Sequence, residues 1–178
     1  MSEFSESYHL RSDRAEDAVD LLRRAKLKGY VFEPADGWVT FLVEDAVFKP
    51  NQRIVDCSRQ LLLHYVSAED HRWGFSLFSK GKTACAYSCA WDPHLTVNDT
   101  EYCREELERL VPSADSSLLD EFEQNMRPAG YRDLNGAEVS KTFARALGLE
   151  HYDWVAYHYL ERDFRFARDR RPDVIVVH

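Results

Sequence analysis

The chain has 178 residues, 44% of them hydrophobic, which is enough for one domain that closes its own core without disulfides or metals. Its formal net charge of −8 argues against binding to nucleic-acid phosphates and to anionic lipid, since both rest on Lys and Arg. No apolar run approaches the roughly 20 residues that span a bilayer, and the start of the chain lacks the basic and apolar regions of a signal peptide. We therefore expect a cytoplasmic protein that binds neither nucleic acid nor membranes.

The first elements predicted along the chain are a short strand at 8–11 and a helix. Asp13 and Glu16 have the spacing of a capping box, apolar residues recur after them at helical intervals, and Gly29 is placed to end the helix. Two β-rich runs then flank a Pro-Ala-Asp-Gly turn at 34–37. This part of the sequence predicts a strand, a helix and a hairpin.

The same order of helix and hairpin then recurs, with Pro50 and Asn51 at the predicted start of the second helix. In each copy a Tyr-Val pair is followed by a Trp eight residues after the Tyr, and the copies are 35 residues apart. These residues are Tyr30, Val31 and Trp38 in the first copy and Tyr65, Val66 and Trp73 in the second. We interpret the pattern as two related α-β-β units of one mostly antiparallel sheet. The alternative is chance, because aromatic residues make up 13% of the chain.

A further strand is predicted at 83–91, and it carries Cys85 and Cys89. On a strand these two residues lie roughly 13 Å apart, whereas a disulfide needs Cα atoms within about 7 Å. No CxxC spacing occurs, so neither a structural metal nor any cofactor is expected. In a reducing compartment Cys57 and Cys103 are also expected to be free thiols.

The second half of the chain has helical patterns. Helices are predicted at 98–111, where Asn98 and Glu101 have capping-box spacing, at 118–126 and at 139–147. Residues 152–160 are dense in Tyr, Trp and Val, which predicts a buried strand.

The tail at 173–178 fits either a last strand or an unpaired end. We therefore expect a single α+β domain over 1–178. Its duplicated sheet portion covers 1–92, and a helical extension that returns to the sheet covers 93–178.

Acidic residues are concentrated between Asp99 and Asn125. This stretch holds nine acids and only two arginines, a net charge of −7. The pattern is typical of solvated helix faces, and it also suits a docking surface for a basic protein. The residues expected to form that surface are Glu101, Glu105, Glu108, Asp120 and Glu121.

The sequence contains none of the spacings that phosphate loops, dinucleotide folds, zinc proteases, serine hydrolases or EF-hands require. The most chemically suggestive cluster is His64, Glu69, Asp70 and His71, because carboxylates beside imidazoles can bind a metal or share a proton. A solvated turn selects the same residue types. If the chain has a pocket, we expect it to be lined by aromatic residues and an Asp-His pair: Tyr30, Trp38, Tyr65, Asp70, His71, Trp73 and Trp91.

In composition the chain resembles small acidic bacterial proteins, toxin-neutralising immunity proteins among them, although no site residue follows from that resemblance. The missing catalytic motifs and the acidic stretch favour a non-enzymatic protein-interaction domain with immunity- or antitoxin-like binding of a basic partner. The alternative is a small-molecule-binding or hydrolytic domain that uses the aromatic pocket.

Overall fold

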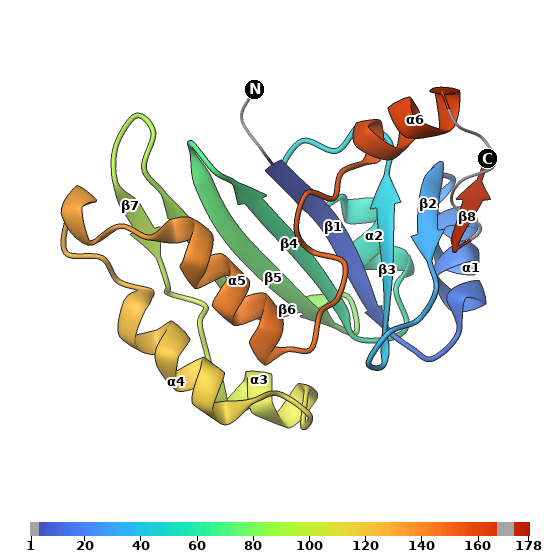
Figure 1. The fold of residues 1–178 in the computed structure, drawn as a ribbon. Helices are drawn as coiled ribbons and strands as arrows, with labels where there is room; N and C mark the ends of the chain where they lie inside the picture. The colour runs from blue at the N-terminus through green and yellow to red at the C-terminus, as the bar shows by residue number, and fades with distance from the viewer. Residues whose placement is uncertain (1–3, 167–172) are drawn as a thin grey trace.

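A computed structural model describes residues 4–166 and 173–178 (Figure 1). Within these residues the centre of the molecule is one antiparallel sheet of eight strands, in the order β7-β6-β5-β4-β1-β3-β2-β8. The strands are β1 (Phe4–Arg11), β2 (Gly29–Phe32), β3 (Trp38–Val43), β4 (Leu62–Ala68), β5 (Arg72–Ser79), β6 (Lys82–Ala90), β7 (Thr96–Asn98) and β8 (Val174–Val177). The prediction of an α+β fold is confirmed.

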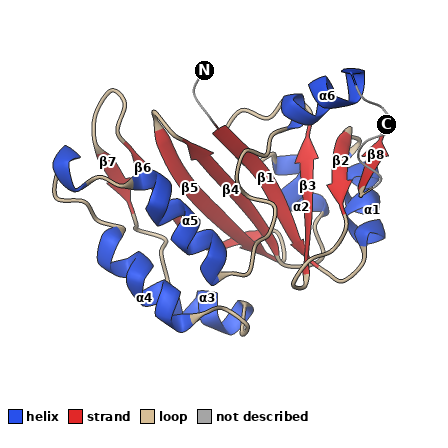
Figure 2. Cartoon of the chain, viewed as in Figure 1, coloured by secondary structure: helices blue, strands red, loops and turns tan. Residues whose placement is uncertain are grey.

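Helices lie on both sides of this sheet (Figure 2). They are α1 (Ala15–Ala25), α2 (Gln52–Cys57), α3 (Arg104–Leu110), α4 (Ser116–Asn125), α5 (Gly136–Ala146) and α6 (Tyr157–Phe166), with a short 3-10 turn at Tyr131–Asp133. None of the helices in the described part of the chain is long and apolar enough to cross a membrane.

The first six elements form a β-α-β-β-α-β unit. β1, α1, β2, β3, α2 and β4 follow one another along the chain, and their strands lie in the order β4-β1-β3-β2. β5, β6 and β7 extend the sheet beyond β4, and β8 pairs with β2 at the other end. The element order α-β-β occurs twice, as α1-β2-β3 and α2-β4-β5. That these two units arose by duplication stays a prediction.

The helices cover the two faces of the sheet unevenly. α1 and α2 pack on one face, over Leu10, Phe41 and their neighbours on β1, β3 and β2. α3, α4 and α5 pack on the opposite face, over Phe75 and Tyr87 in the other half of the sheet (Figure 1). On the first face α2 reaches only the end of β5, at Phe78. The rest of that face, over β4 to β7, carries no helix among the described residues.

The prediction of a strand at 152–160 is wrong. This segment is a loop followed by the first turn of α6, and the chain returns to the sheet through β8. The aromatic density is explained by a helical stripe, because Tyr157, Leu160 and Phe164 recur three to four residues apart and pack against Tyr30.

Helix starts also differ from expectation at two of the three predicted sites. The α1 cap is Arg14, and it makes no side-chain cap bond, so the capping box at Asp13 is wrong. The α3 cap is Cys103 in place of Asn98. The predicted start of α2 at Pro50 and Asn51 agrees with the structure, where Asn51 precedes Gln52 and its side chain accepts a hydrogen bond from the backbone N–H of Arg53 at 3.0 Å.

Candidate functional site

The aromatic residues predicted to line a pocket lie mainly in the hydrophobic core. Trp38, Tyr65 and Trp73 are at most 2% exposed and pack between the sheet and α5. Trp38 Nε1 donates a hydrogen bond to the carbonyl of Leu147 at 2.9 Å. Tyr30 belongs to a separate cluster, where it stacks on Phe164 of α6. These rings therefore contribute to two packed layers.

The predicted polar residues around the β4–β5 turn have different settings. Asp70 is exposed in the turn. His71 Nδ1 lies 2.8 Å from Asp92 Oδ2, and both side chains are more than half exposed. His64 is buried in the sheet beside Glu6. Trp91 is half-buried, next to Gly136. His64 and His71 line two different hollows.

Part of the predicted acidic surface is neutralised by an arginine of the same helices. Arg104 forms ion pairs with Glu108 at 2.8 Å, Asp120 at 3.0 Å and Glu123 at 3.1 Å, which ties α3 to α4. No ion pair among the described residues reaches Glu101, Glu105 or Glu121. The uncompensated part of the surface is therefore smaller than the sequence suggests.

A buried Ser-His-Thr cluster lies between the sheet and the helices. His9 Nε2 is 2.9 Å from Ser7 Oγ, and His9 Nδ1 is 3.0 Å from Thr40 Oγ1. Burial, together with the nearby His151 and His64, lowers the pKa of His9 to about 3. The three buried side chains satisfy one another's hydrogen-bonding groups, and their role is therefore structural.

The two cysteines of β6 are buried on the side of α3 to α5. Burial raises the pKa of the Cys85 thiol to about 11 and also raises the pKa of Cys89. A nucleophilic cysteine needs the opposite shift, toward the thiolate.

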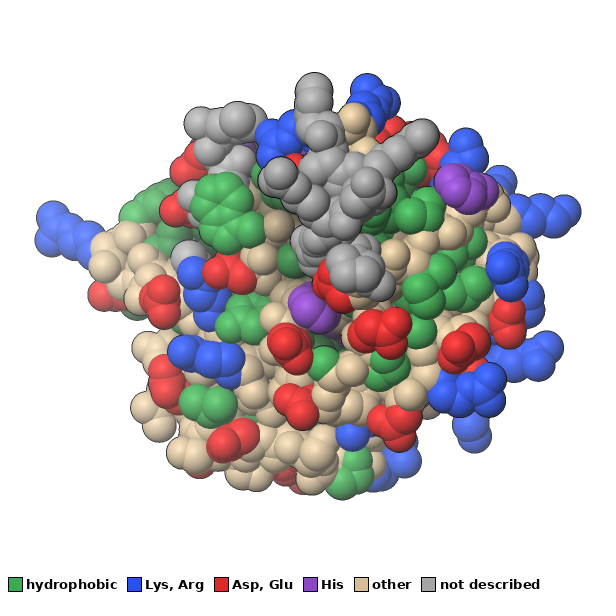
Figure 3. All heavy atoms as spheres, turned by 45° about the vertical axis from the view of Figure 1, so that its right-hand side comes forward, with side chains coloured by type: hydrophobic (Ala, Val, Ile, Leu, Met, Phe, Trp, Pro, Cys, Tyr) green, Lys and Arg blue, Asp and Glu red, His purple; other side chains and the backbone are tan. Residues whose placement is uncertain are grey.

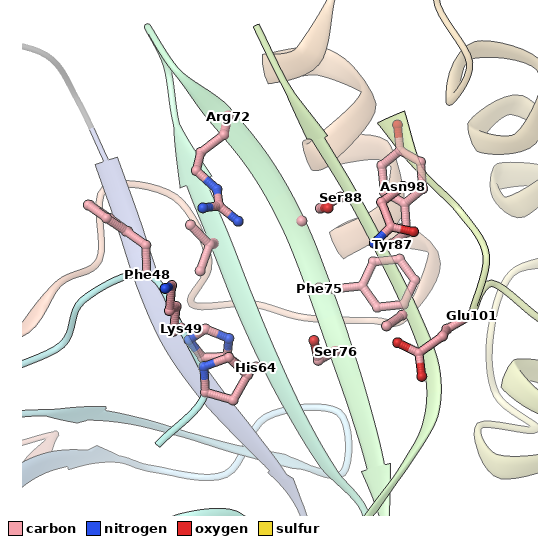
Figure 4. A pocket seen from close by; sticks show the side chains of 14 residues that line it. Phe48, Lys49, His64, Arg72, Phe75, Ser76, Tyr87, Ser88, Asn98 and Glu101 are labelled. Carbon is pink, nitrogen blue, oxygen red and sulfur yellow. The ribbon is translucent and has the colours of Figure 1, made fainter. Parts of the chain in front are cut away.

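A hollow of about 190 Å³ lies on the helix-free face of β4 to β7 (Figure 4). The strand register explains it, because cross-strand neighbours on one face form rows across the sheet. The rows are Ala68–Arg72–Ala90–Thr96, then Val66–Gly74–Ser88–Asn98, then His64–Ser76–Ala86. Small residues occupy the middle of every row except the first, so they form a floor below a taller rim.

Gly74 is required by the close approach of β6. A Cβ at this position would lie 2.7 Å from the carbonyl oxygen of Tyr87 and 3.0 Å from the Cβ of Ser88. The floor therefore dips between Ser76 and Ser88, whose side chains are seen in the middle of the hollow in Figure 4. Neither hydroxyl has a hydrogen-bond partner within the described chain.

One wall of the hollow is fixed by a buried hydrogen bond between Glu6 and His64. Glu6 Oε1 lies 3.0 Å from His64 Nε2, and each side chain is 3% exposed. The other oxygen, Glu6 Oε2, accepts a hydrogen bond from the backbone N–H of Phe48 at 2.7 Å. This bond fastens the loop between β3 and α2 beside the hollow, where Phe48 and Lys49 form part of the rim.

Arg72 and Glu101 lie at opposite corners of the hollow (Figure 4). Arg72 has an alanine on either side, Ala68 on β4 and Ala90 on β6, and these leave room for its side chain. Within the described residues, Arg72 Nε is the only buried side-chain nitrogen or oxygen without a hydrogen-bond partner. Such a group costs about 1–3 kcal/mol, so its retention calls for an explanation.

A larger hollow of about 870 Å³ lies near the start of β1. Its lining combines rings with charged groups, including Phe4, Tyr157, His158, His71 and Arg72. Seen from the side that includes α6, acidic and basic side chains are interspersed on the surface (Figure 3).

Sequence reasoning missed the smaller hollow and Arg72. The available signal was the run of small residues at every second position, Gly74 and Ser76 on one strand and Ala86 and Ser88 on the next. A comparison with protein-family models, curated proteins and solved structures finds no match to this chain.

Proposed function

We propose that this chain is a non-enzymatic protein-interaction domain that holds a segment of a partner protein against the helix-free face of β4 to β7. The observation that carries the proposal is the hollow on this face. An antiparallel sheet often leaves one face to water. This face differs from a plain solvated one because its floor is made of small residues and its rim holds Arg72 and Glu101.

The size of the hollow favours a partner side chain over a cofactor. Sites for drug-sized ligands and cofactors measure about 300–1,000 Å³, whereas this hollow measures about 190 Å³. A group of side-chain size fills it, while the rest of a partner segment crosses the neighbouring strands. The hydroxyls of Ser76 and Ser88 are available to hydrogen bond with it.

The settings of the titratable groups support a role without catalysis. His9 is satisfied in the interior, His64 is paired with Glu6, and the thiols of β6 have raised pKa values. A catalytic base needs access to a reacting proton.

Glu101 connects the hollow with the predicted acidic surface, since it lines the hollow and lies three residues before the start of α3. A partner that crosses the hollow from Arg72 meets Glu101 at the opposite corner, and no ion pair among the described residues neutralises Glu101. This arrangement favours basic residues at that end of the partner segment.

We also propose that the two α-β-β units are related by duplication and differ in function. The corresponding face of β2 and β3 is covered by α1, with Val31 and Val39 in the core. In the second unit β4 and β5 carry Val66 and Gly74 at the hollow. The binding face is thus the surface that the second unit leaves without a long helix.

The larger hollow supports a second candidate, a small-molecule-binding domain. Its volume of about 870 Å³ falls within the range for such ligands. His71 lines it, and Asp92 lies 2.8 Å from His71. If this candidate is right, a thermal-shift screen finds ligands that stabilise the protein, and the stabilisation is lost in His71→Ala and kept in Ser76→Tyr.

A selection from a random peptide library displayed on phage tests the main proposal. The full chain is the target, and Ser76→Tyr fills the floor of the hollow. Thr83→Tyr places the same ring at an exposed position of β6 outside the hollow, as a matched control. We expect selected peptides to bind the unaltered chain and Thr83→Tyr, and to lose affinity by about tenfold or more for Ser76→Tyr. Equal binding to all three would contradict the proposal.

A further inference from the structure

We infer that the segment held on the helix-free face presents the carboxylate of an Asp or Glu side chain to Arg72. This inference rests on the proposed function and names the chemistry that the hollow recognises. The observation behind it is that Arg72 lines the hollow and has no ion-pair partner in the described part of the chain, and that its buried Nε has no hydrogen-bond partner there either.

The neighbours of Arg72 leave its guanidinium free to bind a ligand. Its cross-strand neighbours are Ala68 and Ala90, which have no polar side-chain atoms. The buried carboxylate of Glu6, on the same face, is already engaged through both oxygens by His64 and the backbone of Phe48. No ion pair within the described residues includes Arg72. The protein thus places a permanent cation beside the hollow and does not neutralise it.

The geometry of a guanidinium favours a carboxylate as its ligand. Arg has five N–H donors in a planar fork, which matches the two oxygens of a carboxylate in a bidentate pair. Lysine, with a compact point charge, does not reproduce that geometry. Lys would supply the same positive charge at this position. The bidentate pair explains why the residue is Arg.

The charges around the hollow give the partner segment a direction. Lys49 and Arg72 lie on the side of β4 and β5, and Glu101 lies at the opposite corner beyond β6 (Figure 4). An acidic residue therefore belongs at the Arg72 end and a basic residue at the Glu101 end. A segment placed in the reverse direction sets like charges against each other at both ends.

Peptides obtained in the selection described above provide the test. They are synthesised with acetylated and amidated ends, so that a side chain is the only source of a carboxylate. Affinities are measured for the unaltered chain, Arg72→Lys and Arg72→Gln. Arg53→Lys makes the same replacement at an exposed position of α2 and is the matched control.

We expect the hollow-dependent peptides to share an Asp or Glu. Replacing that residue with Asn or Gln should weaken binding by about 10- to 100-fold. Arg72→Lys should weaken it by about tenfold or more, while Arg53→Lys leaves it unchanged. Loss of the peptide carboxylate should have little further effect in Arg72→Gln, since the two groups form one interaction.

Two other outcomes separate the inference from the proposed function. Peptides that depend on Ser76 but contain no shared acidic residue, or that bind Arg72→Lys and Arg72→Gln unchanged, overturn the carboxylate assignment and leave the interaction domain in place. If no selected peptide is sensitive to Ser76→Tyr, both the interaction face and its ligand are overturned.

Discussion

Glu6 on β1 and His64 on β4 are hydrogen-bonded inside the sheet, with 3.0 Å between Oε1 and Nε2 and only 3% of each side chain exposed. Tyr8 lies against His64, with ring centroids 4.7 Å apart, and its hydroxyl accepts a hydrogen bond from the backbone N–H of Asn51. These contacts hold both ends of the loop from Phe48 to Asn51. The wall of the hollow therefore depends on β1 and β4 lying side by side in the sheet.

Glu6→Ala is expected to lower the free energy of unfolding by about 3 kcal/mol or more. The substitution leaves the imidazole of His64 and the N–H of Phe48 without their buried hydrogen-bond partner, and each unsatisfied group costs about 1–3 kcal/mol. Urea denaturation of the full chain measures the change. Glu105→Ala, on the exposed face of α3, is the control and should stay within about 0.5 kcal/mol. Equal midpoints for the two variants would show that the pair contributes nothing.

The buried His9 predicts a loss of stability in acid. In the folded chain its pKa is about 3, because of burial and the nearby His151 and His64, while its ordinary value is 6.5. Below pH 6.5 the unfolded chain takes up a proton that the folded chain does not accept until about pH 3. The free energy of unfolding should therefore fall through this window, by up to about 1.4 kcal/mol per pH unit.

Denaturation curves at several pH values between 6.5 and 3 check this prediction. His9→Gln cannot take up a proton and should show a shallower slope than the unaltered chain, whatever its absolute stability. His94→Gln, at an exposed position before β7, should keep the slope. If His9→Gln keeps it as well, another group causes the acid sensitivity.

The thiols of Cys103, Cys85 and Cys89 should differ in reactivity. Cys103 is exposed, whereas Cys85 lies beneath it with Sγ accepting a hydrogen bond from the Cys103 N–H at 3.3 Å. Burial raises the pKa values of Cys85 and Cys89, which lowers their thiolate fractions. Iodoacetamide should therefore modify Cys103 well before Cys85 and Cys89, as followed by peptide mass spectrometry. In urea the differences should disappear, and if they persist, protection by the fold is not their cause.

Long periodic segments could be predicted from the sequence, while the hollow could not. The helix expected at 118–126 is found at Ser116–Asn125, because Leu118, Phe122 and Met126 recur at helical spacing. The stretch at 152–160 is short and rich in aromatic residues, so propensity favoured a strand where packing against Tyr30 selects a helix.

The hollow depends on which strands lie side by side. Nothing local in the sequence indicates that Gly74 lies between Val66 and Ser88, or that Arg72 lies between two alanines. That arrangement is set by the register of two hairpins, and a shift of one residue would turn every one of these side chains to the other face. The candidate site is therefore a property of the assembled sheet.

Gly74 and Gly130 form a matched pair that tests this account of the floor. In Gly74→Ala the new Cβ meets the Tyr87 carbonyl oxygen, a backbone atom that cannot move away without separating β5 from β6. We expect a loss of about 1–3 kcal/mol in the free energy of unfolding. In Gly130→Ala the new Cβ has no described atom within 4 Å, and φ is −173°, which any residue adopts. This variant should be neutral or more stable by up to about 1 kcal/mol, because alanine restricts the unfolded chain.

Urea denaturation compares the two variants, and an equal or smaller loss for Gly74→Ala than for Gly130→Ala would show that the strands can separate at no cost. The floor of the hollow would then be set by something other than the close approach of β6.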